Sequence, residues 1–421
     1  MTEFCSAPYI YTFEITSACN ARCVGCGNVF PHDGVHITAR DCQVILRHVS
    51  HPEMFRVTGG EPTLSPEFAE IMRLLDQQGK PIVVFTNGAW AEPDDVVRIL
   101  RSCKNLDGIL VSLHGHTAAS YQAFTHTDYF STVLTNIRRA REAGIAVNTN
   151  TILTHWNIDH MEQVVEIATH AGAQVVAFSR YYGSPIPGLT DLSPEQYKYA
   201  VDQVARLRTA GKQVKFNNNI PFCLGGELTQ ACPAGDTHCT ISPAGKVRLC
   251  NHLPYEVGDI LRTPIEQVWQ SHVVQEWRGQ IPAMCQRCVA FDLCKGGCRA
   301  NARANGSAKD PLACGPCQTM PKPPAPVQHL LWGKAFPKAN FSLHQESFGY
   351  VLVNRSRIFK VTDEATALMD VLRRGDSTLA EIRALFGQAA LNFVGLLYDN
   401  RMLELSTNAK VLQVRSDDFS H

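Results

Sequence analysis

The chain has 421 residues, of which 45% are hydrophobic and 19% are charged, so it can bury more than one substantial core and is not intrinsically disordered. Its 39 basic and 39 acidic side chains give a formal net charge of zero, which argues against a protein that mainly binds nucleic acid or an anionic membrane. No apolar run reaches the roughly 18 residues of a membrane span, and the first residues lack the basic segment of a signal peptide. We therefore expect a cytoplasmic protein without a membrane partner.

Cysteine is unusually frequent, with 16 residues. Most of them lie in two clusters, one near the amino terminus and one after residue 231. In a reducing cytoplasm, clustered thiols more often bind metal or do redox work than form disulfides. The composition therefore points to metal or redox chemistry.

Residues 8–217 alternate short β-branched runs with longer amphipathic segments. The predicted strands are 10–15, 55–58, 82–86, 108–113, 145–153 and 174–179, and the helices between and after them are 38–49, 66–77, 93–101, 130–143, 161–171 and 194–210. Repeated strand-then-helix units indicate a parallel sheet with right-handed crossovers. A closed eight-stranded barrel needs two more units, so the expected α/β fold is a partial (β/α)6 TIM-like barrel over residues 1–218.

Residues 219–320 have short elements, frequent glycine and proline, and repeated cysteines, which predicts a cysteine-rich domain held by metal rather than by burial. A proline-rich linker is expected at 321–338. Residues 339–421 regain a compact pattern. Its predicted strands are 341–343, 350–353 and 358–361, and its predicted helices are 364–374, 378–386 and 389–398. This order is typical of a small winged-helix-like α+β domain.

Three cysteines, Cys19, Cys23 and Cys26, follow the first predicted strand with spacings of three and two residues. Barrel folds place their chemistry at the carboxyl ends of such strands. A cubane iron–sulfur cluster needs four ligands, so three thiolates would leave one iron open to a small molecule. The alternative is a structural zinc site with a distant fourth ligand, which is less favoured because zinc sites usually pair one CxxC with another.

This CxxxCxxC motif resembles that of the radical S-adenosylmethionine (radical SAM) superfamily, and the Gly-Gly-Glu-Pro sequence after the second strand resembles its GGEP motif, which contacts the methionine amino group. The resemblance implies a SAM-binding [4Fe-4S] cluster and reductive cleavage of SAM to a 5′-deoxyadenosyl radical, which takes a hydrogen atom from the substrate. It also implies that the SAM pocket is lined by Gly59, Gly60, Glu61, Pro62, Asn87, Ser112, Asn150 and Arg180. Ordinary strand-end polarity is the alternative for the last four, and Arg180 is also a candidate to reach a carboxylate or the substrate.

The later cysteines resemble the SPASM extension of radical SAM enzymes, which carries auxiliary iron–sulfur clusters. The resemblance assigns the first auxiliary [4Fe-4S] cluster to Cys232, Cys239, Cys250 and Cys298. It assigns the second to Cys285, Cys288, Cys294 and one further cysteine, with Cys314 preferred over Cys317. Three [4Fe-4S] clusters are then expected in all. Two structural zinc sites are the alternative, and Cys5, Cys42, Cys103 and Cys223 are expected to be packed or idle.

One SPASM subgroup, the anaerobic sulfatase-maturating enzymes, has a catalytic aspartate directly after the ligand that corresponds to Cys250. The residue here is Asn251, which cannot serve as a base, so formylglycine formation by that route is in doubt. His252 follows it and is either a substitute base or a hydrogen-bond partner beside the cluster.

The carboxyl-terminal segment resembles a PqqD-like recognition element, a module that binds the leader of a ribosomally made precursor peptide by adding it to a sheet edge. A generic appendage used for packing or dimerisation is the alternative. The leading hypothesis is a peptide maturase that binds its ribosomal precursor through the leader and receives electrons from a flavodoxin- or ferredoxin-type donor. The alternatives are a radical SAM enzyme acting on a small molecule such as a tetrapyrrole, and a non-catalytic iron–sulfur electron carrier.

Overall fold

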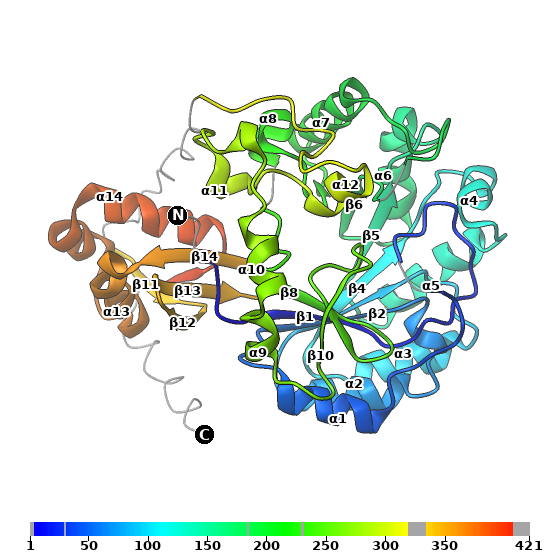
Figure 1. The fold of residues 1–421 in the computed structure, drawn as a ribbon, viewed down its shortest axis with the longest axis horizontal. Coiled ribbons are helices and arrows are strands. Elements are labelled where there is room, and N and C mark those ends of the chain that lie inside the picture. Colours follow the sequence, from blue (N-terminus) through cyan, green and yellow to red (C-terminus); the bar gives the residue numbers. More distant parts are fainter. Residues whose placement is uncertain (1–3, 29–30, 183–184, 229–230, 319–333, 407–421) are drawn as a thin grey trace. The chain divides into compact units, whose positions relative to one another are not determined.

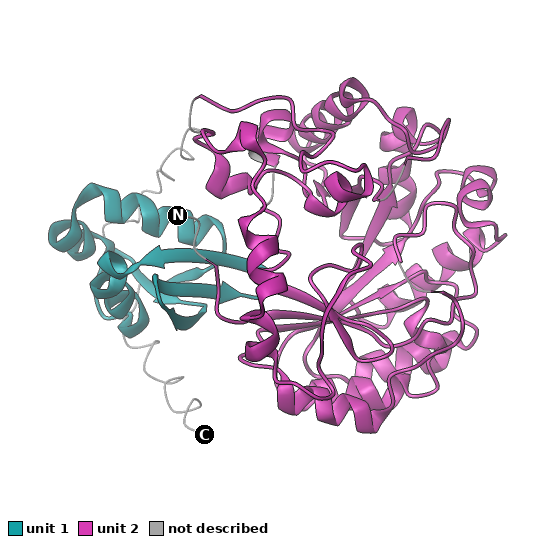
Figure 2. Ribbon diagram, viewed as in Figure 1, with its two compact units in different colours: residues 1, 322–421 teal, residues 2–321 magenta. Residues whose placement is uncertain are grey.

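The computed structural model describes residues 4–28, 31–182, 185–228, 231–318 and 334–406. The chain divides into two compact units, residues 2–321 and residues 322–421 (Figure 2). Most of the expected linker at 321–338 lies outside the described residues. Among the residues described, no helix is long and apolar enough to cross a membrane.

The first unit is built on a parallel sheet, as the sequence predicts (Figure 1). The six predicted strands are present and lie side by side in chain order: β1 (Ile10–Glu14), β2 (Met54–Thr58), β3 (Ile82–Thr86), β4 (Leu106–Ser112), β5 (Val147–Ile152) and β6 (Val175–Ser179). A seventh parallel strand, β7 (Val214–Phe216), follows β6. Its three residues are too short to give a recognisable sequence pattern.

Helices follow the strands and cover one face of this sheet. They are α1 (Ala39–His48), α2 (Phe68–Asp76), α3 (Pro93–Ser102), α4 (Ala118–Thr125), α5 (Phe130–Glu142), α6 (Met161–His170) and α7 (Pro194–Thr209). The sequence marks several starts clearly: Thr38 and Asp41 form a capping box at α1, and Ser193 caps α7 with Pro194 in its first turn. Helix α4, which has no strong apolar stripe, was not predicted.

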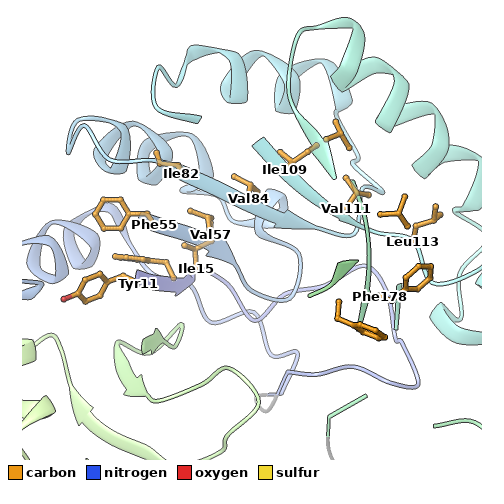
Figure 3. Packing of buried hydrophobic residues seen from close by; sticks show 14 of the residues in the cluster. Tyr11, Ile15, Phe55, Val57, Ile82, Val84, Ile109, Val111, Leu113 and Phe178 are labelled. Carbon is orange, nitrogen blue, oxygen red and sulfur yellow. The ribbon is translucent and has the colours of Figure 1, made fainter. Parts of the chain in front are cut away.

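Successive side chains of each strand point to opposite faces of the sheet. Residues such as Tyr11, Phe55 and Val111 lie on one face and pack into the core under the helices (Figure 3). The residues between them on the strands face the other way and include the polar side chains of Glu14, Ser112 and others. The helix-covered face therefore supplies stability, and the opposite face is available for chemistry.

The cysteine-rich segment continues the same sheet instead of forming a separate layer. Its strands β8 (His238–Ile241), β9 (Lys246–Arg248) and β10 (Glu256–Asp259) extend the sheet beyond β1, with β8 parallel to β1. Its short helices are α8 (Phe222–Gly225), α9 (Ile265–Trp269), α10 (His272–Gly279), α11 (Phe291–Cys294) and α12 (Arg299–Ala304). The segments expected at 1–218 and 219–320 thus share one sheet within one compact unit.

The second unit is a small α+β fold. Strands β12 (Ser342–Glu346), β13 (Gly349–Asn354) and β14 (Arg357–Thr362) form an antiparallel sheet, and β11 (Phe336–Ala339) pairs with β15 (Leu403–Ser406). Its helices are α13 (Thr366–Arg374) and α14 (Leu379–Asp399). Gly387, with a φ of 82°, interrupts α14, so the two helices predicted at 378–386 and 389–398 follow each other across a bend. The winged-helix assignment itself stays a prediction.

Candidate functional site

The loop after β1 brings the first three cysteines together. The pKa of the Cys23 thiol is raised to about 12, first by burial and then by the neighbouring Cys26 and Cys19. Burial disfavours a free, charged thiolate, but a bound iron ion supplies the opposite charge and stabilises the thiolate as its ligand. Among the described residues, no three His, Cys, Asp or Glu side chains converge on a position for a single metal ion. The three grouped thiols fit the three-thiolate set expected of a SAM-binding cluster.

The glycines after β2 pack directly against this loop. The N–H of Gly60 donates to Thr16 O and that of Glu61 to Ala18 O, both at 2.7 Å. A Cβ atom on Gly60 would lie only 2.2 Å from Ala18 O, so a larger residue would push the two segments apart. The Gly-Gly-Glu-Pro motif therefore fixes the position of the thiol-bearing loop.

The carboxylate of Glu61 is turned into the protein. Its Oε1 accepts hydrogen bonds from the hydroxyls of Thr63 (2.7 Å) and Thr86 (2.8 Å), and its Oε2 accepts from the Asn87 N–H (2.7 Å). Burial raises the pKa of Glu61, and the hydrogen bonds from Asn87, Thr63 and Thr86 oppose the rise. The expected contact of this motif with the methionine amino group of SAM stays a prediction; within the protein, the carboxylate anchors Thr63, Thr86 and Asn87.

Asn87 connects this carboxylate to the thiol loop. Its Nδ2 donates to Asn20 Oδ1 at 2.6 Å and lies 4.0 Å from Cys19 Sγ. Its Oδ1 accepts from the N–H of Ala89 at 2.8 Å. Asn87 therefore lies beside the thiols, as expected of a residue in the cofactor pocket.

Ser112 and Asn150 are neighbours on the polar face of the sheet. They are paired in register on β4 and β5, and Asn150 Oδ1 accepts from the Ser179 hydroxyl at 2.7 Å. The structure thus brings these predicted pocket residues together, with Ser179 as an addition that the sequence pattern did not single out.

Arg180 requires a correction. It was expected to contact SAM or the substrate, but it is only 1% exposed and forms a bidentate ion pair with Asp310, at 2.7 and 2.8 Å. Asp310 Oδ2 also accepts from the N–H of Cys298 at 2.6 Å. The carboxylate that Arg180 binds is therefore the protein's own, and the pair locks the end of β6 to the cysteine-rich segment.

A second group of thiols consists of Cys232, Cys250 and Cys298. Burial raises the pKa of the Cys298 thiol, and the nearby Cys232 and Cys250 add to the rise. The phenol of Tyr182 lies beside the same three thiols, which together with burial raise its pKa well above the usual value. These three cysteines fit the first auxiliary set.

Cys239 does not join this group. It lies within β8 opposite Tyr11 of β1, and paired residues in a parallel sheet point to the same face. Tyr11 and Cys239 both belong to the core under the helices, whereas Arg248 of β9 ion-pairs with Glu14 on the opposite face. Cys239 was expected as a ligand, but the structure buries its thiol on the other side of the sheet.

A third group contains Cys285, Cys288, Cys294 and Cys317, and Cys223 lies beside it. Burial raises the pKa of Cys317 to about 11, and Cys288, Cys223 and Cys294 add to the rise. The N–H of Cys317 donates to Cys288 Sγ at 3.2 Å. This group fits the second auxiliary set, with Cys317 in the last place.

Cys314, which the sequence favoured for that place, is exposed and lies against Cys223 instead. Its N–H donates to Cys223 Sγ at 3.3 Å, and its thiol donates to Cys223 O at 3.1 Å. Cys223 was expected to be packed or idle, and no local spacing could have shown its approach to Cys314, because 91 residues separate the two cysteines.

Serine substitution should separate the two candidates for the last ligand. We expect Cys317→Ser to lower the iron content by about four atoms per chain, because one thiolate of a cubane set is lost. Cys314→Ser should keep the full iron content. Iron analysis and Mössbauer spectra of anaerobically reconstituted protein measure both, and the opposite pattern would return the role to Cys314.

The first and second thiol groups are linked by His252. Its Nδ1 lies 2.9 Å from Gly27 O, directly after Cys26, and its ring stacks on Tyr182 with centroids 3.8 Å apart. A Cβ atom on Gly27 would lie 2.5 Å from the His252 ring. Burial lowers the pKa of His252 to about 4, so its imidazole is neutral here and hydrogen-bonded to Gly27 O; the role of a substitute base stays a prediction.

Comparisons with known proteins show which families the chain is similar to. Residues 13–168 match the model of the radical SAM superfamily, and residues 232–289 match that of SPASM, an iron–sulfur cluster-binding domain. The chain is 28% identical over 313 residues to the mycofactocin maturase MftC of Mycobacterium tuberculosis, covering 70% of this chain and 79% of the relative.

The chain is also similar to a second curated relative and to a solved structure. The chain is 24% identical to the AdoMet-dependent heme synthase of Methanosarcina barkeri, covering 72% of this chain and 95% of the relative. The crystal structure of Streptococcus suis SuiB bound to its precursor peptide SuiA superposes with a TM-score of 0.59 at 16% identity, over 73% of this chain and 75% of that one. The last comparison shows a shared fold.

Proposed function

We propose that this protein, an enzyme that uses S-adenosylmethionine for radical chemistry, is a maturase that modifies a ribosomally synthesised precursor peptide. The observation that carries the proposal is the separate α+β unit at residues 322–421, joined to a unit that holds the three thiol groups. The name of the relative MftC and the peptide complex of SuiB support a peptide substrate.

The SAM cofactor and its cluster would be held where the first thiol group lies. Cys19, Cys23 and Cys26 would bind the [4Fe-4S] cluster, which supplies the electron that splits the sulfonium of SAM. The chain itself contributes the rigid turn at 59–62 and the amide of Asn87 beside Cys19. Ser112 and Asn150 provide polar contacts on the same face of the sheet.

We assign two auxiliary clusters to the other thiol groups. Cys232, Cys250 and Cys298 would hold the first, and Cys285, Cys288, Cys294 and Cys317 the second, which makes three clusters in all. The electron that starts the reaction would come from a flavodoxin- or ferredoxin-type carrier.

The second unit offers a way to recognise the peptide. Strands β12 and β14 are the end strands of its three-stranded sheet, and an extended leader peptide can pair with such an edge through main-chain hydrogen bonds. A tethered recognition unit raises the effective concentration of the core peptide at the active site. This unit would therefore act as the PqqD-like recognition element.

Deleting residues 327–421 should separate recognition from chemistry. We expect the truncated protein to lose most of its affinity for the precursor peptide and to keep uncoupled SAM cleavage, because residues 2–321 form a compact unit of their own. Fluorescence anisotropy of a labelled leader and chromatography of 5′-deoxyadenosine measure the two. Unchanged peptide modification after the deletion would contradict the recognition role.

A small molecule such as a tetrapyrrole is the second candidate substrate, because the chain is also similar to an AdoMet-dependent heme synthase. Co-expression with short reading frames from the same locus, followed by mass spectrometry, decides between the two. A mass change in a peptide supports the maturase. SAM cleavage that is coupled to a porphyrin and to none of the peptides would support the alternative.

A further inference from the structure

A polar cavity opens next to the first auxiliary thiol group. Its volume is about 320 Å³, and its lining includes Tyr255, Gln280, Arg299, Arg303 and Ser307. No carboxylate side chain lines it. Two arginines therefore line the cavity, and the acidic groups near Arg299, which are Cys232 and Asp236, lie outside the lining.

Arg299 is held in this cavity with unused hydrogen-bonding capacity. It is 7% exposed, and its Nη1 donates to Trp277 O at 2.7 Å. Its Nε is buried and has no partner among the described residues. A buried donor without an acceptor is costly, and the charge of Arg299 is stabilised by Cys232 and Asp236, which lie nearby.

Within the described part of the chain, Arg303 is positioned by contacts with neutral groups. Its Nη2 donates to Gln280 Oε1 at 2.7 Å, and its guanidinium lies over the rings of Tyr255 and Trp277, at 5.2 and 5.4 Å from their centroids. Tyr255 is 51% exposed. The cavity thus combines two preorganised cations with an exposed aromatic ring, a combination suited to a protein partner with an acidic surface.

One residue that lines the cavity, Arg299, is next to two thiols of the first auxiliary group. Arg299 directly follows Cys298, and its N–H is hydrogen-bonded to Cys232. Tyr255 comes five residues after Cys250, the third thiol of the same group. A redox partner that docks here would bring its own centre close to the first auxiliary set.

We propose that this cavity is the docking point for the acidic surface of a one-electron carrier of the flavodoxin or ferredoxin class. Acidic side chains of the carrier pair with Arg303, the buried Arg299 adds positive charge beside it, and the carrier's surface covers Tyr255. The reduced carrier gives up one electron and the auxiliary cluster accepts it, with no bond made or broken. The inference rests on the proposed electron donor and adds the place where that donor binds.

Charge reversal at Arg303 tests the docking point. We expect Arg303→Glu to slow reduction of the reconstituted protein by reduced flavodoxin at least tenfold at low ionic strength, since charge complementarity mainly sets the association rate. Raising the salt should shrink the difference. Stopped-flow bleaching of cluster absorbance and EPR spectra follow the reduction. Arg138→Glu, on the exposed side of α5, makes the same charge change elsewhere and should have no such effect.

Reduced methyl viologen, a small cationic reductant that needs no protein docking site, serves as the control electron donor. Its rate should not fall in Arg303→Glu, which should also keep its iron. If flavodoxin reduces Arg303→Glu as fast as wild type, or if the variant is slowed equally with viologen, the docking point is wrong. If instead the variant loses affinity for the peptide and keeps flavodoxin reduction, the cavity serves the substrate. If the wild type accepts electrons from viologen but from neither flavodoxin nor ferredoxin, the proposed donor class itself fails.

Discussion

Replacing Asp310 with asparagine is expected to lower the free energy of unfolding of residues 2–321 by about 3–5 kcal/mol, because it leaves the buried Arg180 guanidinium without its counter-charge. Asp310 accepts from both Nη atoms of Arg180 and from the N–H groups of Cys298 and Leu312. Replacing its carboxylate therefore also disturbs the position of Cys298 in the first auxiliary thiol group. We expect the iron content to fall by about four atoms per chain, one cubane cluster.

An exposed ion pair provides the matched control. Glu70 and Arg73 are about half exposed on α2, and Glu70→Gln should have little effect on the free energy of unfolding. Anaerobic chemical denaturation and iron analysis compare the two variants. If the denaturant concentration at the midpoint of unfolding is no lower for Asp310→Asn than for Glu70→Gln, and the iron content is full, the buried pair has no structural role. The double variant Arg180→Met/Asp310→Leu should recover part of the stability, since no buried charge remains alone.

The largest effect on activity is expected from Cys23→Ala. Two thiolates cannot hold a cubane and present SAM to it, so production of 5′-deoxyadenosine should fall to background, with or without substrate. The spectrum of the SAM-binding cluster should also be lost, while the auxiliary clusters, which lie on other segments of the chain, should remain.

Cys42→Ala is the control for this change. Cys42 lies on α1 in the hydrophobic core, and burial, aided by Glu70 and Asp41, raises the pKa of its thiol to about 12, as for Cys23. Its side chain has no part in any thiol group, so we expect SAM cleavage to continue with only a modest loss of stability. Persistent SAM cleavage by Cys23→Ala would overturn the assignment of the first thiol group.

The three thiol groups are held by elements that also determine the fold. Strand β8 joins the cysteine-rich segment to β1, the Arg180–Asp310 pair joins it to β6, and His252 contacts the loop that carries Cys26. The group of Cys232, Cys250 and Cys298 is therefore fixed relative to the loop that carries Cys26 within one compact unit. Such rigidity would suit electron transfer between the proposed clusters, because the distance between them would stay constant.

Sequence alone determined the features that depend on near neighbours in the chain. Alternating apolar runs and capped amphipathic segments gave the parallel strands and most helices, because these patterns report local periodicity. The spacing of Cys19, Cys23 and Cys26 defined the first thiol group in the same way. The glycines at 59 and 60 marked a turn that must approach another segment closely.

Only the tertiary structure decided which distant residues meet. Cys239 points to the core because of the face that β8 presents after pairing with β1, and a shift of one residue would have turned it to the other side. Arg180 and Asp310 are separated by 130 residues, and Cys317 meets Cys288 through a hydrogen bond that only folding creates. Residue type limits which groups can bind iron or pair charges, but long-range packing determines which of them do, since that packing depends on the whole chain.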